Sequence, residues 1–581
     1  MVLDPPNTEI IPKPMSHAQN LTLEQCIGLK MMLDIRFFDS GDGAGPVLRL
    51  PPQLAQGLAE IGPCGVIVFR ENLESVAQCQ QLTADIRGCL TANALIGIDQ
   101  EGGRVTRLPR KETTSFSGNM ALAACPSPEN EKLARGVGET QARELKALGI
   151  NLNFVPSLDV NSDPHNPVIG VRSFGDDPSV VARLGRELLG GLQNSGVAGA
   201  LKHFPGHGDT SQDSHTDLPC VARSRDDAYA IDLAPFVRVI AEAAPAMVMT
   251  AHIQYPALDA SYISGTDVVV PATLSRVMMT DLLREELGFA GVIISDALDM
   301  KAISARMTPA EAVKHCFAAG VDIALMPLLV RSKESLDQLL ELVRIVAEAV
   351  RRGEIDEAEV RASADRILAV QQQYALGHKD PVAKGDEVIA CSQHLALEKR
   401  IAQASVTLLS GTLKPLGASA KVHLLMPGKD TAAAMCAALL SVEPSLVISW
   451  QSLESFDATR EQALLEKADV YLVGVSEPAS SAVALGGAED LPNLPDASPA
   501  SVQKALLRQA TALQRIVLML NSPYRAPEYE ALTEAALASY DGAAVGVAGA
   551  PGPAYLALAK VLCGQLKIEG KLPVELDASR T

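Results

Sequence analysis

Ionisable side chains are most concentrated in one short stretch of the sequence, KHFPGHGDTSQDSH at residues 202–215. The stretch contains Lys202, His203, His207, Asp209, Asp213 and His215. It follows an apolar run at residues 196–201 that is typical of a buried strand. Because burying so many ionisable groups in a core would be costly, the pattern predicts a polar loop at the C-terminal end of that strand. This is where α/β enzymes place their catalytic groups.

Two residues of this stretch could transfer a proton. Asp213 and His215 are two positions apart, so on an extended or looped backbone their side chains can face the same way and share a hydrogen bond. A carboxylate partner fixes the tautomer of a histidine and stabilises its imidazolium, which lets the ring donate and recover a proton near neutral pH. The alternative is a zinc or iron site. Its ligands would be His203, His207, Asp209 and His215, although no HxH or HExxH spacing supports it.

A candidate nucleophile lies in IISDALDM, residues 293–300. The apolar run at residues 292–294 leads straight into Ser295 and Asp296. A carboxylate at the end of a strand is held by the sheet rather than by a mobile loop, which suits a nucleophile. Asp299 is the alternative, and Asp296 is preferred because it is closer to the strand.

A third polar segment, IGIDQEGGRVTRL, occupies residues 96–108. Asp99 leaves an apolar run here, and Gly102 and Gly103 permit a tight turn toward Arg104 and Arg107. The glycine spacing is not that of a phosphate-binding loop. We therefore do not interpret this segment as a phosphate-binding loop.

The elements that must position these groups are eight apolar runs separated by segments of helical spacing. The runs lie at residues 31–35, 65–69, 95–98, 152–155, 196–201, 246–250, 292–294 and 321–325. Helices are predicted between them, for example at residues 129–148 and 275–287, which end at Gly149 and Gly288. This alternation predicts an α/β fold, a (β/α)₈ TIM-type barrel, with a doubly wound open sheet as the competing fold.

Polar residues at the predicted strand ends favour the barrel. They are Asp99, Lys202, His203, His252 and Asp296. Each alone could simply cap a turn, but in a barrel all five converge on one mouth.

The length of 581 residues exceeds what one hydrophobic core normally serves, so a second domain is expected. Residues 1–20 are predicted to be a flexible tail, 21–375 the barrel, 376–400 a linker, and 401–581 a smaller α/β sandwich domain. Its predicted strands are residues 405–409, 422–426, 470–475 and 516–520, and its predicted helices include 432–440 and 500–510. Residues 476–501, rich in Ala, Ser, Gly and Pro, are expected to form a long loop.

Composition restricts the partners. A net charge of −19 argues against nucleic acid and against an anionic membrane surface, because both would repel the protein. The ten cysteines include no CxxC pair and fit free thiols in a reducing compartment, so we expect a cytoplasmic protein. The N-terminus has no apolar signal-peptide region, and no window has the apolar length of a membrane span, although export remains an alternative.

Four motifs in order resemble glycoside hydrolase family 3, in particular its β-N-acetylglucosaminidase, NagZ-like branch. They are IGIDQEGGRVTRL at 96–108, NPVIGVRSFG at 166–175, KHFPGHGDTSQDSH at 202–215 and GVIISDALDM at 291–300. The resemblance covers residues from about 30 to 375. Two further segments, LNSPYRAPEY at 520–529 and GKLPVEL at 570–576, look like the α/β sandwich domain of two-domain members.

The resemblance implies a retaining glycosidase that releases terminal β-linked N-acetylglucosamine from small oligosaccharides such as muropeptide or chitin fragments. It implies that Asp296 is the nucleophile and that His215, assisted by Asp213, is the general acid/base. The implied sugar-binding residues are Asp99, Arg107, Arg172, Lys202 and His203. His207 and Asp209 are expected to shape the loop, and no cofactor or metal is expected.

Three alternatives stay open at this point. A β-glucosidase of the same family would take its acid from the second domain, where GGAEDLPNLP at residues 486–495 offers Glu489. A phosphorylase would transfer the sugar to phosphate, which a histidine acid/base would not repel as a carboxylate would. A non-catalytic sugar-binding protein is disfavoured because nucleophile and acid/base candidates are both present.

Overall fold

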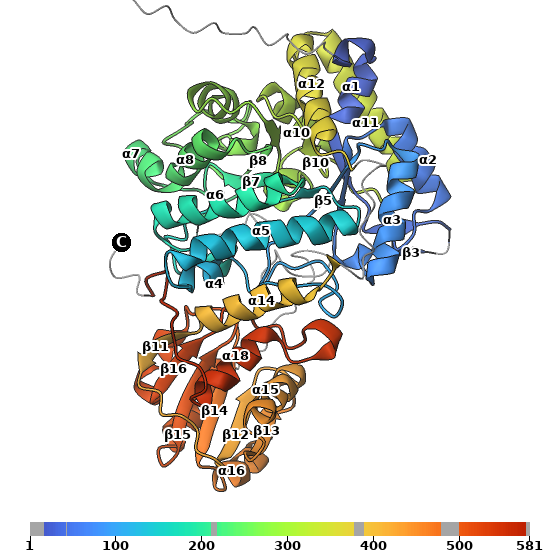
Figure 1. Cartoon of the computed structure of the whole chain (residues 1–581). Coiled ribbons are helices and arrows are strands. Elements are labelled where there is room, and N and C mark those ends of the chain that lie inside the picture. The colour runs from blue at the N-terminus through green and yellow to red at the C-terminus, as the bar shows by residue number, and fades with distance from the viewer. Residues whose placement is uncertain (1–16, 42, 211–217, 377–387, 478–498, 577–581) are drawn as a thin grey trace, which may run out of the picture.

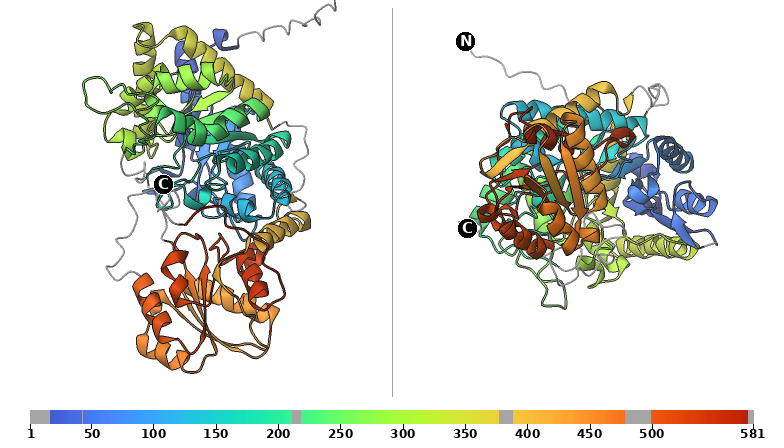
Figure 2. Two further views of the ribbon diagram at one scale, coloured as in Figure 1. Left: turned by 90° about the vertical axis from the view of Figure 1, so that its left-hand side faces the viewer. Right: turned by 90° about the horizontal axis from the view of Figure 1, so that it is seen from below.

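The chain forms two α/β domains, and helix α14 (Ser392–Ser405) lies between them (Figure 1). The computed structural model describes residues 17–41, 43–210, 218–376, 388–477 and 499–576. The first domain runs from blue to yellow in Figure 1, and the second, in orange and red, lies at one end of it in Figure 1 and in the left view of Figure 2.

The first domain is a barrel of eight parallel strands, as the sequence predicts. In spatial order they follow β10-β1-β4-β5-β6-β7-β8-β9. A parallel bridge between Ile294 and Ile323 joins the last strand back to the first and nearly closes the sheet. The strands are β1 (Met31–Asp34), β4 (Gly65–Val68), β5 (Leu95–Ile98), β6 (Leu152–Asn153), β7 (Ala198–Phe204), β8 (Met247–Thr250), β9 (Val292–Ile294) and β10 (Ala324–Leu325).

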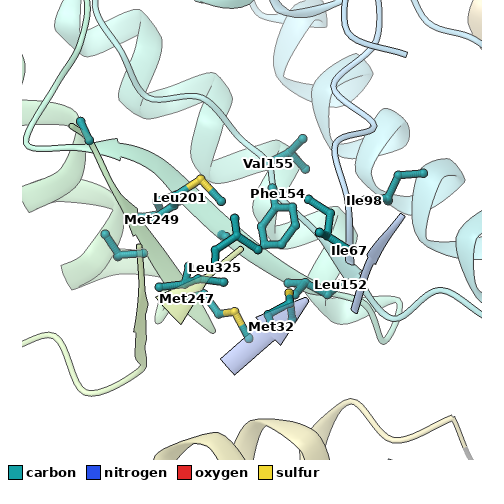
Figure 3. Close-up of a cluster of buried hydrophobic side chains, with 14 of the residues drawn as sticks. Met32, Ile67, Ile98, Leu152, Phe154, Val155, Leu201, Met247, Met249 and Leu325 are labelled. Carbon is teal, nitrogen blue, oxygen red and sulfur yellow. The ribbon is translucent and has the colours of Figure 1, made fainter. Parts of the chain in front are cut away.

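Apolar side chains fill the inside of the barrel. Figure 3 shows Met32, Phe154, Leu201, Met247 and Leu325 gathered there from different strands or the residues next to them. All of them are at most 2% exposed. Because helices cover the outer face, the strands are buried on both sides, which explains why they are continuous apolar runs instead of alternating ones.

Helices around the barrel agree closely with the predicted segments. The predicted helix at 129–148 is α5 (Glu129–Ala147), and the one at 275–287 is the π-helix η6 (Val277–Glu286). Gly149 and Gly288 follow them with φ of 77° and 66°, a left-handed conformation that favours glycine. The other barrel helices include α1 (Leu23–Leu29), α2 (Pro52–Ile61), α3 (Val76–Cys89), α4 (Asn119–Ala124), α6 (Pro178–Asn194), α8 (Ala234–Ala243), α10 (Pro309–Ala318), α11 (Lys333–Arg351) and α12 (Glu357–Gln373).

Several strand boundaries differ from the predicted ones, and the difference that bears on the site is the end of β7. Strand β7 extends to Phe204, so Lys202 and His203 lie inside the strand and not on the loop after it. The pairing with β8 continues to Phe204 through a register shift after Leu201. In a sequence, a charged side chain usually indicates the end of a buried strand. Here Lys202 and His203 continue the strand because the buried carboxylates of Glu101 and Asp159 pair with them.

The second domain contains a six-stranded sheet in the order β11-β16-β15-β14-β12-β13, parallel except for β11. The strands are β11 (Thr407–Gly411), β12 (Lys421–Met426), β13 (Val447–Ser452), β14 (Val470–Val475), β15 (Gln514–Met519) and β16 (Ala535–Ala538). The helices are α15 (Lys429–Val442), α16 (Ala458–Leu465), α17 (Pro499–Gln509) and α18 (Pro553–Leu562). The sequence prediction missed β13, a half-exposed edge strand with polar residues, and β16, whose alanines have little strand propensity.

The connection between the domains differs from the predicted linker at 376–400. Helix α14 (Ser392–Ser405) occupies its second half and packs against α4 and α5 of the barrel and α18 of the second domain (Figure 1). The strand predicted at 405–409 therefore begins later, at Thr407. Of the loop predicted at 476–501, residues 478–498, which include Glu489, lie outside the described residues.

Two further findings bear on composition. All ten cysteines are free thiols. Within the described ranges, no helix combines the length and the apolar character needed to cross a bilayer.

A buried carboxyl group on α14 makes stability depend on pH. Glu398 accepts a hydrogen bond of 2.9 Å from Ser115 N of the barrel. Burial, and then the charges of Asp541 and Glu144, raise the pKa of Glu398 from 4.5 to about 7. Since the folded state holds this proton more tightly than the unfolded chain, stability falls as the pH rises from about 4.5 to about 7.

We therefore expect Glu398→Gln, which keeps the acceptor for Ser115, to unfold at a higher temperature than the wild type at pH 8. At pH 5 the two proteins should unfold at nearly the same temperature. Thermal denaturation followed by circular dichroism measures both. An equal shift at the two pH values would contradict the assignment.

Candidate active site

Residues at the C-terminal ends of β5 and β7 form a charged cluster. The Lys202 ammonium lies 2.8 Å from Asp99 Oδ1 and 2.6 Å from Glu101 Oε1. Burial disfavours the charged form of Lys202, but Asp99 and Glu101 outweigh that effect and raise its pKa. Lys202 is thus a permanent cation held between two carboxylates.

A second cation joins this cluster from the loop after β6. Arg172, at the end of the 3-10 helix η3 (Gly170–Arg172), donates to both oxygens of Glu101 over 2.9 and 2.8 Å. Burial opposes ionisation of Glu101, but Arg172 and Lys202 together hold the pKa of that carboxyl well below its usual range. The bidentate ion pair fixes Arg172 and ties the β5 loop to the β6 loop.

Asp159, in the segment after β6, organises the two histidines near β7. Its Oδ2 lies 2.8 Å from His203 Nδ1, and its Oδ1 accepts hydrogen bonds from the backbone N of His203 and of His207. Burial opposes ionisation of Asp159, yet His203 and these donors lower its pKa far below the usual range. The carboxylate thereby fixes the tautomer of His203 with the proton on Nδ1.

Asp296 is held between the ends of β8 and β9. Its backbone N donates to Thr250 Oγ1 over 3.3 Å, and its Oδ1 accepts a 2.8 Å hydrogen bond from Ala297 N. His252 Nε2 donates to the Ala297 carbonyl over 2.9 Å. The carboxylate is therefore placed by sheet and neighbouring backbone, as the sequence position predicts.

His207 lies close enough to Asp296 for the charge of that carboxylate to affect the pKa of the histidine ring. Burial of the ring, and then the neighbouring His203, lower the pKa of His207 to about 4, against opposing effects of Asp159 and Asp296. The ring is neutral at physiological pH, and its Nδ1 lies 2.7 Å from Thr210 Oγ1. His207, expected only to shape the loop, thus stands among the groups of the barrel mouth.

Asp299 belongs to a different group of side chains. Burial, and then the charge of Asp34, raise its pKa to about 6, although Arg36 and Arg331 oppose the shift. Asp34 ends β1 and pairs with Arg36 at 3.0 Å and with Arg331 at 2.6 Å. Asp299 therefore lies on the β1 and β10 side of the barrel mouth. Near neutral pH a larger fraction of this carboxyl is protonated than of an ordinary aspartate.

The remaining predicted residues are distributed as follows. Arg107 contacts Asp99 at 3.9 Å and lies 5.6 Å from the ring of Phe69. Asp209 pairs with Arg223 at 2.7 Å, which fits its expected role in loop architecture. Asp213 and His215 lie outside the described residues. Over the described part of the chain, no three His, Cys, Asp or Glu side chains are grouped as metal ligands.

Sequence reasoning missed three buried carboxylates, Glu101, Asp159 and Asp34. Asp34 directly follows an apolar run in MMLD, the same signal that identified Asp99 and Asp296. Asp159 lies further from its strand, in NFVPSLD, and Glu101 is two residues beyond Asp99. Only the fold shows that Asp159 pairs with His203 and that Glu101 pairs with Lys202.

A cavity of about 830 Å³ lies between the domains. The barrel contributes Arg104 and Arg110 to its wall, and the second domain contributes Glu477 and Asp541. Arg104 forms an ion pair with Glu477 at 3.5 Å, and burial together with the charge of the nearby Arg172 lowers its pKa. The second domain therefore reaches the edge of the barrel mouth.

Comparison with known proteins gives consistent matches. Residues 48–370 match the family described as "Glycosyl hydrolase family 3 N terminal domain". Beta-hexosaminidase A from Pseudoalteromonas piscicida is 38% identical, covering 96% of this chain and 97% of that protein. A beta-hexosaminidase from a serogroup C strain of Neisseria meningitidis is 39% identical over 51% of this chain and 79% of its own.

A solved structure resembles the whole chain. It is a glycoside hydrolase family 3 beta-N-acetylglucosaminidase from Paenibacillus sp., with a TM-score of 0.79 and 32% sequence identity. The match covers 96% of this chain and 100% of the other. Both domains and their order are therefore shared with that structure.

Proposed function

Since the chain belongs to glycoside hydrolase family 3, we propose that it is a retaining β-N-acetylhexosaminidase releasing terminal β-linked N-acetylglucosamine. Its substrates are oligosaccharides of the cell-wall muropeptide or chitin type. The family assignment, and the names of the relatives that match nearly the whole chain, support this activity. The observation that carries the mechanism is the fixed carboxylate of Asp296 at the same barrel mouth as the Asp99–Lys202–Glu101–Arg172 cluster.

In the first step, Asp296 attacks the anomeric carbon and forms a covalent glycosyl-aspartate while the glycosidic bond breaks. His215, assisted by Asp213, donates its proton to the leaving oxygen. In the second step, the same histidine takes a proton from water, and the water oxygen displaces Asp296 from the anomeric carbon. Two inversions at this carbon give net retention.

The sugar-binding residues act through charge and fixed geometry. Asp99, Lys202 and Arg172 present carboxylate, ammonium and guanidinium groups to sugar hydroxyls, and His203 and Arg107 complete the set. Because Glu101 and Asp159 hold Arg172, Lys202 and His203 in place before the substrate arrives, little ordering cost remains for binding. Asp296 suits the nucleophile better than Asp299, whose pKa of about 6 leaves a large neutral fraction near that pH.

The test of the function is hydrolysis of an aryl β-N-acetylglucosaminide beside the matching β-glucoside, each with and without phosphate. We expect the N-acetylglucosaminide to be cleaved faster and phosphate to leave the rate and the product unchanged. A preference for the glucoside would favour the Glu489 alternative, and a sugar phosphate product would favour a phosphorylase.

Replacement of His215 tests the acid/base. In His215→Gln we expect kcat/KM for an N-acetylglucosamine disaccharide to fall about 10²- to 10⁴-fold, because its poor leaving group needs a proton. For a dinitrophenyl glycoside, whose leaving group needs no proton, the rate of the first step should fall far less. Steady-state kinetics across aryl glycosides of graded leaving-group pKa measures this, with His165→Gln, an exposed histidine, as the control. An equal loss for all leaving groups would exclude the role.

A further inference from the structure

The second domain contacts the loop that carries Arg172 through a segment with no role in the mechanism above, residues 520–529. Asn161 Nδ2 of the barrel donates to the Tyr524 hydroxyl over 2.6 Å. The same asparagine accepts, through Oδ1, a 2.9 Å hydrogen bond from Gly170 N. Gly170 begins the short η3 helix that ends at Arg172. A chain of two hydrogen bonds therefore links Tyr524 to the turn that presents Arg172.

The ring of Tyr524 also packs on this turn. A Cβ atom placed on Gly170 would lie 3.8 Å from Tyr524 Cε2, which is van der Waals contact. Gly170 has a φ of 46°, a left-handed conformation that favours glycine. The aromatic ring thus covers Gly170, which has no side chain to fill this space itself.

The second domain holds the other end of the same loop. Asp176 N donates to the Pro573 carbonyl over 3.3 Å, and Asp176 Oδ2 accepts a 2.6 Å hydrogen bond from Glu575 N. These contacts follow Arg172 in the chain, whereas the Tyr524 contact precedes it. Arg172 therefore lies between two points of attachment to the second domain.

The segment that contains Tyr524 reaches the β5 loop as well. Asn521 hydrogen-bonds to Glu477 through both the backbone N and the carbonyl of that residue, at 2.9 and 3.1 Å. Glu477 in turn pairs with Arg104 at 3.5 Å. The two loops braced in this way are those joined by the Glu101–Arg172 ion pair.

We propose that Tyr524 is a positioning residue for substrate binding, which makes the second domain part of the sugar site. It acts through Asn161 and Gly170 to hold Arg172 against Glu101 in the orientation that meets the sugar. The inference rests on the proposed function for the identity of the substrate. It predicts an effect on substrate binding that exceeds any effect on the chemical step.

The experiment compares Tyr524→Phe with Tyr529→Phe. The second variant also loses a buried tyrosine hydroxyl of the second domain, but its partner is Gln503 of the same domain, at 2.9 Å. For Tyr524→Phe we expect KM for an aryl β-N-acetylglucosaminide to rise about 3- to 10-fold, as for loss of one hydrogen bond, with kcat changed much less. Tyr529→Phe should keep the wild-type KM, although both variants lose some thermal stability.

A double-mutant cycle with Asn161→Ala tests the path. Asn161→Ala alone should raise KM at least as much as Tyr524→Phe does. Adding Tyr524→Phe to Asn161→Ala should then have little further effect on KM, because both changes break the Asn161–Tyr524 hydrogen bond. An unchanged KM in Tyr524→Phe, an equal rise in Tyr529→Phe, or additive effects in the cycle would each overturn the proposal. A wild-type protein that does not cleave the substrate would instead refute the proposed function, which separates the two failures.

Discussion

Asp296→Asn is expected to lower kcat on aryl β-N-acetylglucosaminides by about 10³-fold or more, because the amide cannot act as a nucleophile. The change is nearly isosteric, and the amide oxygen can still accept the hydrogen bond from Ala297 N. The Asp296 backbone bond to Thr250 is untouched. Stability should therefore change little, and the loss should appear in kcat more than in KM. Steady-state kinetics and thermal denaturation of the same preparation measure both.

Asp299→Asn is the matched control, since it removes the neighbouring carboxylate and leaves Asp296 in place. We expect it to retain substantial activity and to unfold at a slightly higher temperature near neutral pH. The reason is that burial and Asp34 make ionisation of Asp299 unfavourable in the folded protein, with a pKa of about 6. If Asp299→Asn were the inactive variant and Asp296→Asn the active one, the nucleophile would be Asp299.

Lys202→Met is expected to have the second largest effect. It removes the cation between Asp99 and Glu101 and leaves two carboxylates close together with less compensation. Breaking a buried ion pair in this way costs about 3–5 kcal/mol of unfolding free energy. We also expect kcat/KM to fall about 10²-fold or more, since a group that we propose to contact the sugar is lost and its neighbours are disturbed. Urea denaturation and steady-state kinetics provide the two measurements.

The pH dependence of this effect follows from Glu101. Its pKa is depressed in the folded protein, so its ion pairs stabilise the fold above the unfolded pKa near 4.5, and that contribution disappears as the pH falls further. The stability difference between wild type and Lys202→Met should thus be largest near neutral pH and shrink below about pH 4.

Lys30→Met is the control for burial of a lysine. Lys30 is 2% exposed and Lys202 is 1% exposed, but Lys30 precedes β1, at the opposite end of the barrel, and donates to the Val321 carbonyl. It should change stability without a specific change in KM. Wild-type kcat/KM in Lys202→Met, or an equal loss in Lys30→Met, would contradict the assignment of Lys202 to the site.

Sequence reasoning was most successful where one physical rule applied. Parallel strands buried on both faces give apolar runs, and a polar residue at the end of such a run points to the barrel mouth. All eight barrel strands and the position of Asp99 and Asp296 follow from this rule. The same rule failed for Lys202 and His203, because charged residues can continue a strand when partners such as Glu101 and Asp159 lie across from them.

Contacts between distant segments could not be predicted in this way. Glu101 meets Arg172 across 71 positions, and Asn161 meets Tyr524 across 363. Neither pair has a periodic signal. The first depends on how two loops of the barrel face one another, and the second on how the two domains pack. The strands β13 and β16 escaped prediction for local reasons, since β13 is a half-exposed edge strand with polar residues and the alanines of β16 have little strand propensity.

We propose that Asp296 forms the covalent intermediate. The most direct test is to incubate the enzyme with a 5-fluoro N-acetylglucosaminyl fluoride, which slows the second step, and to locate the label by peptide mass spectrometry. We expect one sugar residue added to the peptide that contains residues 292–300, with fragmentation placing it on Asp296. A label on Asp299, or release of the α-anomer of the sugar without any labelled peptide, would contradict it.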